Sequence, residues 1–105
     1  MQRLTLVRYT TKPDQTAKNE ALARAVYDEL RATGPQDVAY ALFRSGDEWV
    51  HLFVNLKADD SAALTELPSF NAYSADIAGR CVAPPEVSRM AVELLEAYGF
   101  KNALT

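Results

Sequence analysis

Two β-type runs separated by a short turn constrain the fold of this chain most strongly. Residues 37–44 and 48–56 are rich in β-branched and aromatic side chains, and Ser-Gly-Asp stands between them at 45–47. This chemistry and spacing favour a tight hairpin, so the two runs are predicted to be antiparallel neighbours in one sheet. A first strand is predicted over residues 3–10, because that segment has the same composition.

The segment between the first strand and the hairpin has the period of an amphipathic helix. Apolar residues recur at every fourth position over residues 17–33, with charged residues between them. The predicted buried face consists of Ala21, Leu22, Ala25, Val26 and Leu30. Asp14 or Thr16 is expected to cap the start of the helix, and Gly34 with Pro35 is expected to end it.

A second helix is predicted to start at Pro68, after a short helical turn over residues 61–66. Its apolar stripe consists of Phe70, Tyr73, Ile77, Ala78 and Cys81. Tyr73 is therefore expected to be a core residue. Cys81 is the only cysteine of the chain, which excludes an intrachain disulfide, and its place on the stripe predicts a buried, small hydrophobic side chain.

Residues 86–97 have two opposing interpretations. Pro84 and Pro85 precede a segment whose apolar positions fit a helical stripe, so the local pattern favours a helix. The other elements favour a strand, because three strands and two helices leave a sheet edge unpaired. A fourth strand beside the first would complete a two-layer α+β sandwich.

The strand at 48–56 carries two chemically different faces, since side chains alternate along a strand. One face is wholly aliphatic and consists of Val50, Leu52, Val54 and Leu56. The other face consists of Trp49, His51, Phe53 and Asn55. We expect the helices to cover the aliphatic face, which would leave the second face open.

The face that carries the only histidine of the chain is the candidate site. His51 could act as a general base near neutral pH, while Asn55 and the Trp49 N–H could donate to a developing oxyanion. The predicted ligand-binding residues beside them are Tyr9, Tyr40, Phe53 and Arg44. The alternative is that this face is buried against a partner subunit, because amphipathic aromatic residues suit such interfaces.

Length and charge exclude several classes of protein. The chain is predicted to be one domain over residues 1–105, because that length buries one modest core. A formal net charge of -3 with scattered Lys and Arg predicts no nucleic-acid binding, and the basic signature of RNA-recognition domains is missing from the third strand. With no apolar leader and no membrane-spanning run, a cytoplasmic location without membrane contact is expected.

No cofactor and no metal site is predicted. The four glycines are isolated, which excludes a Gly-rich phosphate-binding loop, and the sequence has no Cys-x-x-Cys or His-Glu-x-x-His motif. Asp59 and Asp60 are interpreted as a loop and helix cap, because no further ligands cluster with them in the sequence.

Short motifs spread along nearly the whole chain carry a family resemblance. They are Val7-Arg8-Tyr9, Lys12-Pro13-Asp14, Trp49-Val50-His51-Leu52, Phe70-x-x-Tyr73 with Ile77, and Arg80-Cys81-x-x-Pro84-Pro85. Together they resemble the dimeric α/β-barrel superfamily that contains the antibiotic-biosynthesis-monooxygenase-like proteins. The resemblance implies a ferredoxin-like β-α-β-β-α-β sandwich, with a four-stranded antiparallel sheet, two helices on one face and a strand over 86–97. It also implies a homodimer in which two sheets pack face to face.

The same resemblance implies a range of activities. Enzymes of the superfamily include cofactor-free oxygenases of aromatic polyketides, haem-degrading enzymes and isomerases of small lactones. The oxygenases tend to use Asn, Trp, His and Tyr around a cavity, and the matching positions here are Tyr9, Trp49, His51 and Asn55. The chain is thus expected to be a cofactor-free monooxygenase-like homodimer acting on a small aromatic or polyketide-like molecule. The alternative is a non-catalytic homodimer that binds a small hydrophobic ligand or serves as a scaffold.

Overall fold

The computed structural model describes residues 2–56 and 62–99. Its elements are β1 (Gln2–Thr10), a 3-10 turn η1 (Pro13–Gln15), α1 (Thr16–Thr33), β2 (Val38–Ser45), β3 (Glu48–Asn55), α2 (Ala62–Thr65), α3 (Pro68–Ser74), α4 (Ile77–Arg80) and β4 (Glu86–Val92). The predicted helical turn at 61–66 corresponds to α2. Asp59 and Asp60, interpreted above as a loop and cap, lie outside the described residues.

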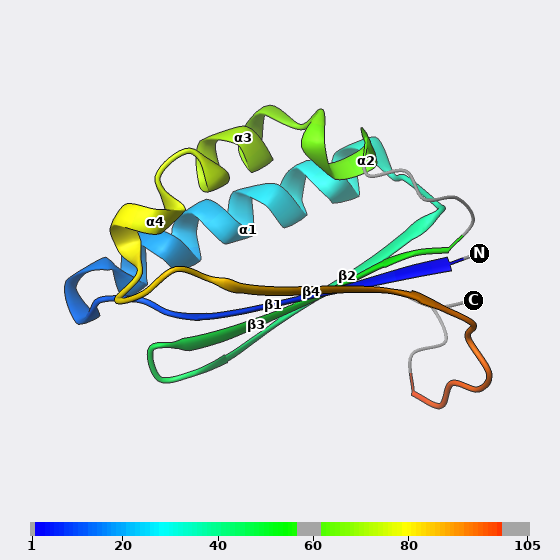
Figure 1. The fold of residues 1–105 in the computed structure, drawn as a ribbon. Helices are drawn as coiled ribbons and strands as arrows, with labels where there is room; N and C mark the ends of the chain where they lie inside the picture. The colour runs from blue at the N-terminus through cyan, green and yellow to red at the C-terminus, as the bar shows by residue number, and fades with distance from the viewer. Residues whose placement is uncertain (1, 57–61, 100–105) are drawn as a thin grey trace.

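The four strands form one antiparallel sheet in the order β2-β3-β1-β4. The helices lie together on one side of this sheet, and the other side carries no helix among the described residues (Figure 1). The predicted ferredoxin-like α+β sandwich is therefore confirmed. β2 and β3 are joined through Gly46 and Asp47, and Gly46 has a φ of 61°, a conformation that glycine adopts without steric cost.

The last element is a strand, as the sheet-edge argument and the resemblance predicted. β4 pairs antiparallel with β1 and closes the edge that β1 would otherwise expose. The predicted range of 86–97 is too long, because the strand ends at Val92. Pairing with β1 begins at Gln2, so residues beyond Val92 have no β1 residue opposite them.

The buried face of α1 differs from the prediction. Ala23 and Val26 are each 2% exposed and Asn19 is fully buried, whereas Ala21 and Ala25 are exposed. The helix turns once in 3.6 residues, so a strict four-residue repeat drifts by about 40° at each step. The buried face follows spacings of four and then three residues instead.

The prediction for the end of α1 is confirmed, and the prediction for its start is wrong. Gly34 takes the left-handed conformation, with a φ of 63°, and its N–H bonds to the Leu30 carbonyl, as predicted. The predicted side-chain cap is wrong, because Gln15 occupies the cap position without a side-chain hydrogen bond. The preceding 3-10 turn leads directly into α1, and the Thr16 hydroxyl bonds instead to the Asp47 carboxylate in the hairpin, at 2.6 Å.

The predicted second helix is divided into α3 and α4. The backbone leaves the helical conformation at Asp76, where φ is -131° and ψ is 25°. Cys81 is consequently not on a helical stripe but follows α4 and forms an isolated β-bridge with Thr11. It is nevertheless buried in the core, at 4% exposed, as predicted for a small hydrophobic side chain.

The prediction of which sheet face the helices cover is wrong. Trp49, His51 and Phe53 are buried beneath the helices, in one cluster with Ala23 and Val26 of α1. The opposite face is open and carries Leu4, Leu6, Ala41, Phe43, Val50, Leu52 and Met90. Both faces of β3 are apolar enough to bury, so alternation alone does not select one. The aromatic face also carries His51, whose ring needs hydrogen-bond partners when buried, and Tyr73 of the helical layer is one of them.

The register of α1 has a direct test in two alanine substitutions. Ala23→Leu inserts three carbons into a closely packed position and should lower the free energy of unfolding by about 1–3 kcal/mol. Ala25→Leu, two residues away on the exposed face, should change it by less than about 0.5 kcal/mol. Urea unfolding of both variants measures the difference. Equal effects would show that the buried face has been misassigned.

Candidate functional site

His51 lies at the centre of β3, and hydrogen bonds hold both of its ring nitrogens. The Tyr40 hydroxyl is 2.7 Å from Nδ1, and the hydroxyls of Tyr9 and Tyr73 are 2.7 Å and 3.1 Å from Nε2. Tyr9 and Tyr73 also share a hydrogen bond with each other. The three tyrosines come from β1, β2 and α3, so the imidazole connects three strands of the sheet to the helical layer.

A second row of polar side chains stands behind Tyr9. The Arg80 Nε–H donates to the Asn19 side-chain oxygen at 2.9 Å, and the Asn19 amide nitrogen donates to the Tyr9 hydroxyl oxygen at 3.0 Å. Arg80 can only donate, so it fixes which end of the Asn19 amide faces Tyr9. The Tyr9 oxygen therefore accepts from Asn19, and its own proton points into the site, toward His51 or Tyr73.

Burial sets the protonation states of this cluster. Desolvation lowers the pKa of His51 to about 4, so the imidazole is neutral at pH 7. Desolvation also raises the pKa of Tyr9, Tyr40 and Tyr73 above the ordinary tyrosine value, and the Arg80 cation opposes that rise at Tyr9 and Tyr73. Four neutral, hydrogen-bonded groups thus meet beside one fully buried guanidinium.

A cavity of about 520 Å³ opens beside the cluster, between the sheet and the short helices. Its floor comes from the four strands and its roof from α2, α3 and α4. Its aromatic and histidine lining consists of Tyr9, Tyr40, His51, Phe53, Phe70 and Tyr73. The volume is within the range of sites for small organic molecules, roughly 300–1,000 Å³.

The packing of the helices explains why this space is left open. α3 packs beside α1, and both lie on the same side of the sheet (Figure 1). α1 covers the β2–β3 half of the sheet through Val26 and through Tyr27, whose ring stacks on Tyr40 at 4.8 Å. Because α3 rests on α1, the β1–β4 half of the sheet is not tightly covered, and the cavity lies there.

The structure brings together some of the predicted site residues and separates others. His51, Tyr9, Tyr40 and Phe53 all line the cavity. Trp49 does not, because its indole N–H donates to the Thr11 hydroxyl at 3.0 Å.

The remaining two predicted residues also lie apart from the cavity. Arg44 shares the helix-covered face with Tyr40, but its guanidinium binds Glu20 of α1 at 2.8 Å and lies over the Trp49 ring. Asn55 is buried at the far end of β3 and is not among the cavity-lining residues.

Sequence reasoning missed three residues of the cluster. Tyr73 was expected to be a plain core residue, yet its hydroxyl contacts both His51 and Tyr9. Asn19 lies on the buried face of α1, and an amide one turn before Ala23 is a signal that a corrected helical period would have revealed. Arg80 gives no such signal, because its burial depends on the break in the helix between α3 and α4.

Other classes of site receive no support from the described residues. Within 2–56 and 62–99, no group of three or more His, Cys, Asp and Glu side chains lies close enough to hold a metal ion. No helix in the same ranges is long and apolar enough to cross a membrane.

The His51 pKa can be measured without ambiguity, because the chain has a single histidine. In a proton NMR titration, the chemical shifts of the imidazole protons should not change near pH 6.5. They should titrate with a midpoint at about pH 4. A midpoint of about 6 or above would contradict the burial and the hydrogen bonds described for His51.

The same shift links pH to stability. In the unfolded chain His51 becomes protonated below about pH 6.5, whereas in the folded chain it becomes protonated only below about pH 4. The contribution of His51 to the free energy of unfolding is therefore fully present above pH 6.5. It is lost as the pH falls from about 6.5 to about 4, by at most about 1.4 kcal/mol per pH unit. His51→Gln should lack this contribution in urea unfolding, and parallel pH slopes for the two proteins would contradict the linkage.

Comparisons with known proteins place the fold. No protein-family model matches the sequence, and no curated protein matches it significantly. Among solved structures, Rv0793 of Mycobacterium tuberculosis is 25% identical, with 93% of this chain and 100% of that chain covered and a TM-score of 0.69.

Two further structures carry functional names. A protein of Nitrosomonas europaea, provisionally named as an antibiotic biosynthesis monooxygenase, is 16% identical over 87% of this chain and 89% of its own, with a TM-score of 0.72. A variant of SnoaB, a cofactor-independent oxygenase from Streptomyces nogalater, is 16% identical over 90% of this chain and 95% of its own, with a TM-score of 0.63. This chain therefore shares the ferredoxin-like α+β fold of these solved structures.

Proposed function

We propose that this protein is a cofactor-free oxygenase of a small aromatic molecule that carries an acidic hydroxyl or an enolisable position. The observation that carries the proposal is the neutral His51, linked by tyrosine hydroxyls to the wall of a largely apolar cavity. The similarity in fold to a cofactor-independent oxygenase adds support. The aromatic lining favours a planar ring system as substrate.

The first step is removal of a proton from the substrate. Tyr73 lines the cavity and its hydroxyl lies 3.1 Å from His51 Nε2, so it can pass a substrate proton inward. Tyr73 accepts the proton from the substrate hydroxyl and gives its own to Nε2. The result is an imidazolium next to a substrate anion, and the attraction between the two charges offsets the low basicity that burial gives His51.

The second step uses molecular oxygen directly. The electron-rich substrate anion reduces oxygen, one oxygen atom enters the ring system, and the other leaves as water after taking up two protons. The imidazolium of His51 supplies one of these protons, which returns the histidine to its neutral state. The C–H bond that breaks at the oxygenated carbon supplies the other.

A second candidate function is non-catalytic binding of the same class of small molecule. One observation favours it, since both nitrogens of His51 already have tyrosine partners within 3.1 Å. In this arrangement a substrate proton reaches a ring nitrogen by way of a tyrosine hydroxyl. If Tyr73 does not relay the proton, the cavity can still bind a ligand without transforming it.

Oxygen consumption separates the two candidates. Purified protein with a metal chelator and no added cofactor is screened against naphthols, anthrones and other acidic phenolic compounds with an oxygen electrode. Turnover of at least one compound is expected, and His51→Ala should reduce its rate by about 100-fold or more. Tyr73→Phe should also reduce the rate, because it removes the relaying hydroxyl.

Tyr98→Phe is the matched control, because it removes a hydroxyl from a side chain that is 98% exposed. It should retain the wild-type rate. An unchanged rate in a folded His51→Ala variant would exclude the proton-transfer step, and ligand binding without oxygen uptake would favour the non-catalytic function.

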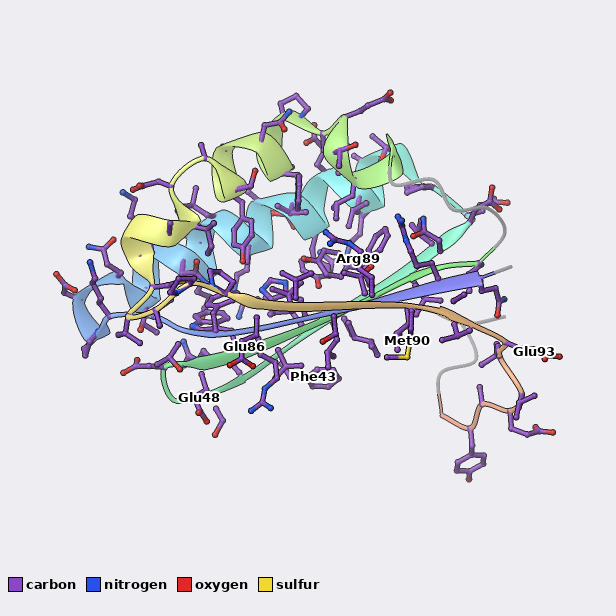
Figure 2. The ribbon with its side chains drawn as sticks, viewed as in Figure 1. Phe43, Glu48, Glu86, Arg89, Met90 and Glu93 are labelled. Atoms are coloured by element: carbon purple, nitrogen blue, oxygen red, sulfur yellow. The ribbon has the colours of Figure 1, made fainter. Side chains whose placement is uncertain are left out.

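We propose in addition that the functional unit is a homodimer formed through the open sheet face. That face presents aliphatic and aromatic side chains, including Phe43 at 54% and Met90 at 51% exposed. Figure 2 shows both on the side of the sheet away from the helices. Monomeric proteins rarely leave a large apolar patch exposed to water. A second copy would cover it by sheet-on-sheet packing.

A charge placed at the centre of this face should disrupt the dimer. Leu52 of β3 is flanked by β1 and β2, so Leu52→Glu should yield a monomer in sedimentation at micromolar concentration, because the carboxylate would be buried without a partner. Ala32→Glu makes the same change of charge on the exposed surface of α1 and should leave the dimer intact. A monomeric wild-type protein would exclude the proposed assembly.

A further inference from the structure

Among the described residues that line the cavity, the charged side chains are all cationic. Its described lining includes two arginines, Arg3 of β1 and Arg89 of β4, and no aspartate or glutamate. The whole chain, in contrast, has more acidic than basic residues and a net charge of -3. A cationic lining inside a protein of negative net charge selects for an anionic ligand, since charged clefts concentrate counter-ions.

The sheet register places the two arginines close together. Arg3 is opposite Ala91 and Thr5 is opposite Arg89, so the two arginines are diagonal neighbours on the same face of the β1–β4 pair. Diagonal neighbours in an antiparallel pair are about 7 Å apart. Figure 2 shows Arg89 on the helix side of the sheet, where the cavity lies. The Arg89 side chain is exposed and makes no ion pair with a described residue.

A third cation stands at the inner end of the site. Arg80 is fully buried beneath the Tyr73 ring, with its guanidinium carbon 5.2 Å from the ring centre. It donates to Asn19 and to the Tyr73 carbonyl, both neutral groups, and Nη1 has no hydrogen-bond partner among the described residues. Its charge is therefore not neutralised by a nearby carboxylate within the described structure. A buried cation without a counter-ion adds to the positive potential of the cavity.

We propose that the ligand of this cavity is an aromatic carboxylate, whose carboxylate binds Arg89 with Arg3 beside it while its hydroxyl reaches Tyr73 and His51. This assignment rests on the proposed function for the role of the hydroxyl end. Arginine suits the other end, because its planar fork matches both oxygens of a carboxylate.

The spacing along the sheet is compatible with such a ligand. Arg89 is opposite Thr5, and His51 is opposite Val7, so the two residues are two strands apart and offset by one two-residue step. Strand spacings of roughly 4.8 Å and a step of about 6.8 Å place their Cα atoms on the order of 12 Å apart. An extended arginine side chain and a fused-ring molecule together fill that distance.

Binding of two matched fluorescent probes tests the assignment. The first is a hydroxynaphthoate with its hydroxyl and carboxylate at opposite ends of the ring system, and the second is the naphthol that lacks the carboxylate. The wild-type protein should bind the naphthoate about tenfold more tightly, because a charged hydrogen bond is lost with the carboxylate. Raising the salt concentration should weaken naphthoate binding and leave naphthol binding unchanged.

Three variants locate the effect. Arg89→Met should weaken naphthoate binding about tenfold and leave naphthol binding unchanged, and Arg89→Lys should restore part of the loss. Arg31→Met removes the same charge from the exposed surface of α1, outside the cavity, and should behave like the wild type. Thermal unfolding of each variant verifies that it is folded.

The outcomes distinguish this inference from the proposed function. Equal affinities for the two probes, an Arg89→Met variant that binds like the wild type, or no detectable binding of either probe would overturn the carboxylate assignment. Oxygen uptake with a neutral phenolic substrate would leave the proposed function intact in that case. If naphthoate binding depends on Arg89 but no oxygen is consumed, the carboxylate assignment is supported and the oxygenase function is excluded.

Discussion

The hydrogen-bond chain from Arg80 through Asn19 and Tyr9 to His51 is the interaction on which the site depends. It connects the end of α4, the first turn of α1 and two strands, so it fixes how the helical layer sits on the sheet. The bonds from Arg80 to Asn19 and from Asn19 to Tyr9 each have one possible direction, because a guanidinium cannot accept a hydrogen bond. Removing one member would leave buried polar partners unsatisfied, which costs more than a typical net hydrogen bond contributes.

The cavity and the open sheet face follow from how this layer is assembled. α3 rests on α1 and leaves space above β1 and β4, and the aromatic residues around it keep the space apolar except at the His51 cluster and the arginines. The aliphatic side of the sheet has no covering element among the described residues. One sheet thus provides a wall for a ligand on one side and, in the proposed assembly, a contact surface for a second copy on the other.

Local patterns in the sequence predicted most of the fold but not the orientation of its layers. Alternation and turn chemistry located β1, β2 and β3, and the stop signal at Gly34 ended α1 correctly. Alternation shows that the two faces of β3 differ, yet it does not show which face the helices cover. The helices cover the face that was predicted to be open, so His51 is buried beneath them. Tyr9, Tyr40 and Phe53 were predicted to bind a ligand beside His51, and all three line the cavity with it. Asn19 and Arg80 required tertiary contacts that no local spacing reports.

The central claim is that His51 is enclosed by three tyrosines beneath the helices and does not face a partner subunit across an open sheet. Nuclear Overhauser effects from the single imidazole test it directly, since they report protons within about 5 Å, comparable to the ring-centre separations of 5.3 Å to Tyr9, 5.8 Å to Tyr40 and 5.7 Å to Tyr73. The account predicts cross-peaks from the imidazole protons to all three tyrosine rings within one subunit. Cross-peaks from the imidazole to the methyl groups of Leu52 or Met90 across a dimer interface, with none to Tyr73, would contradict it.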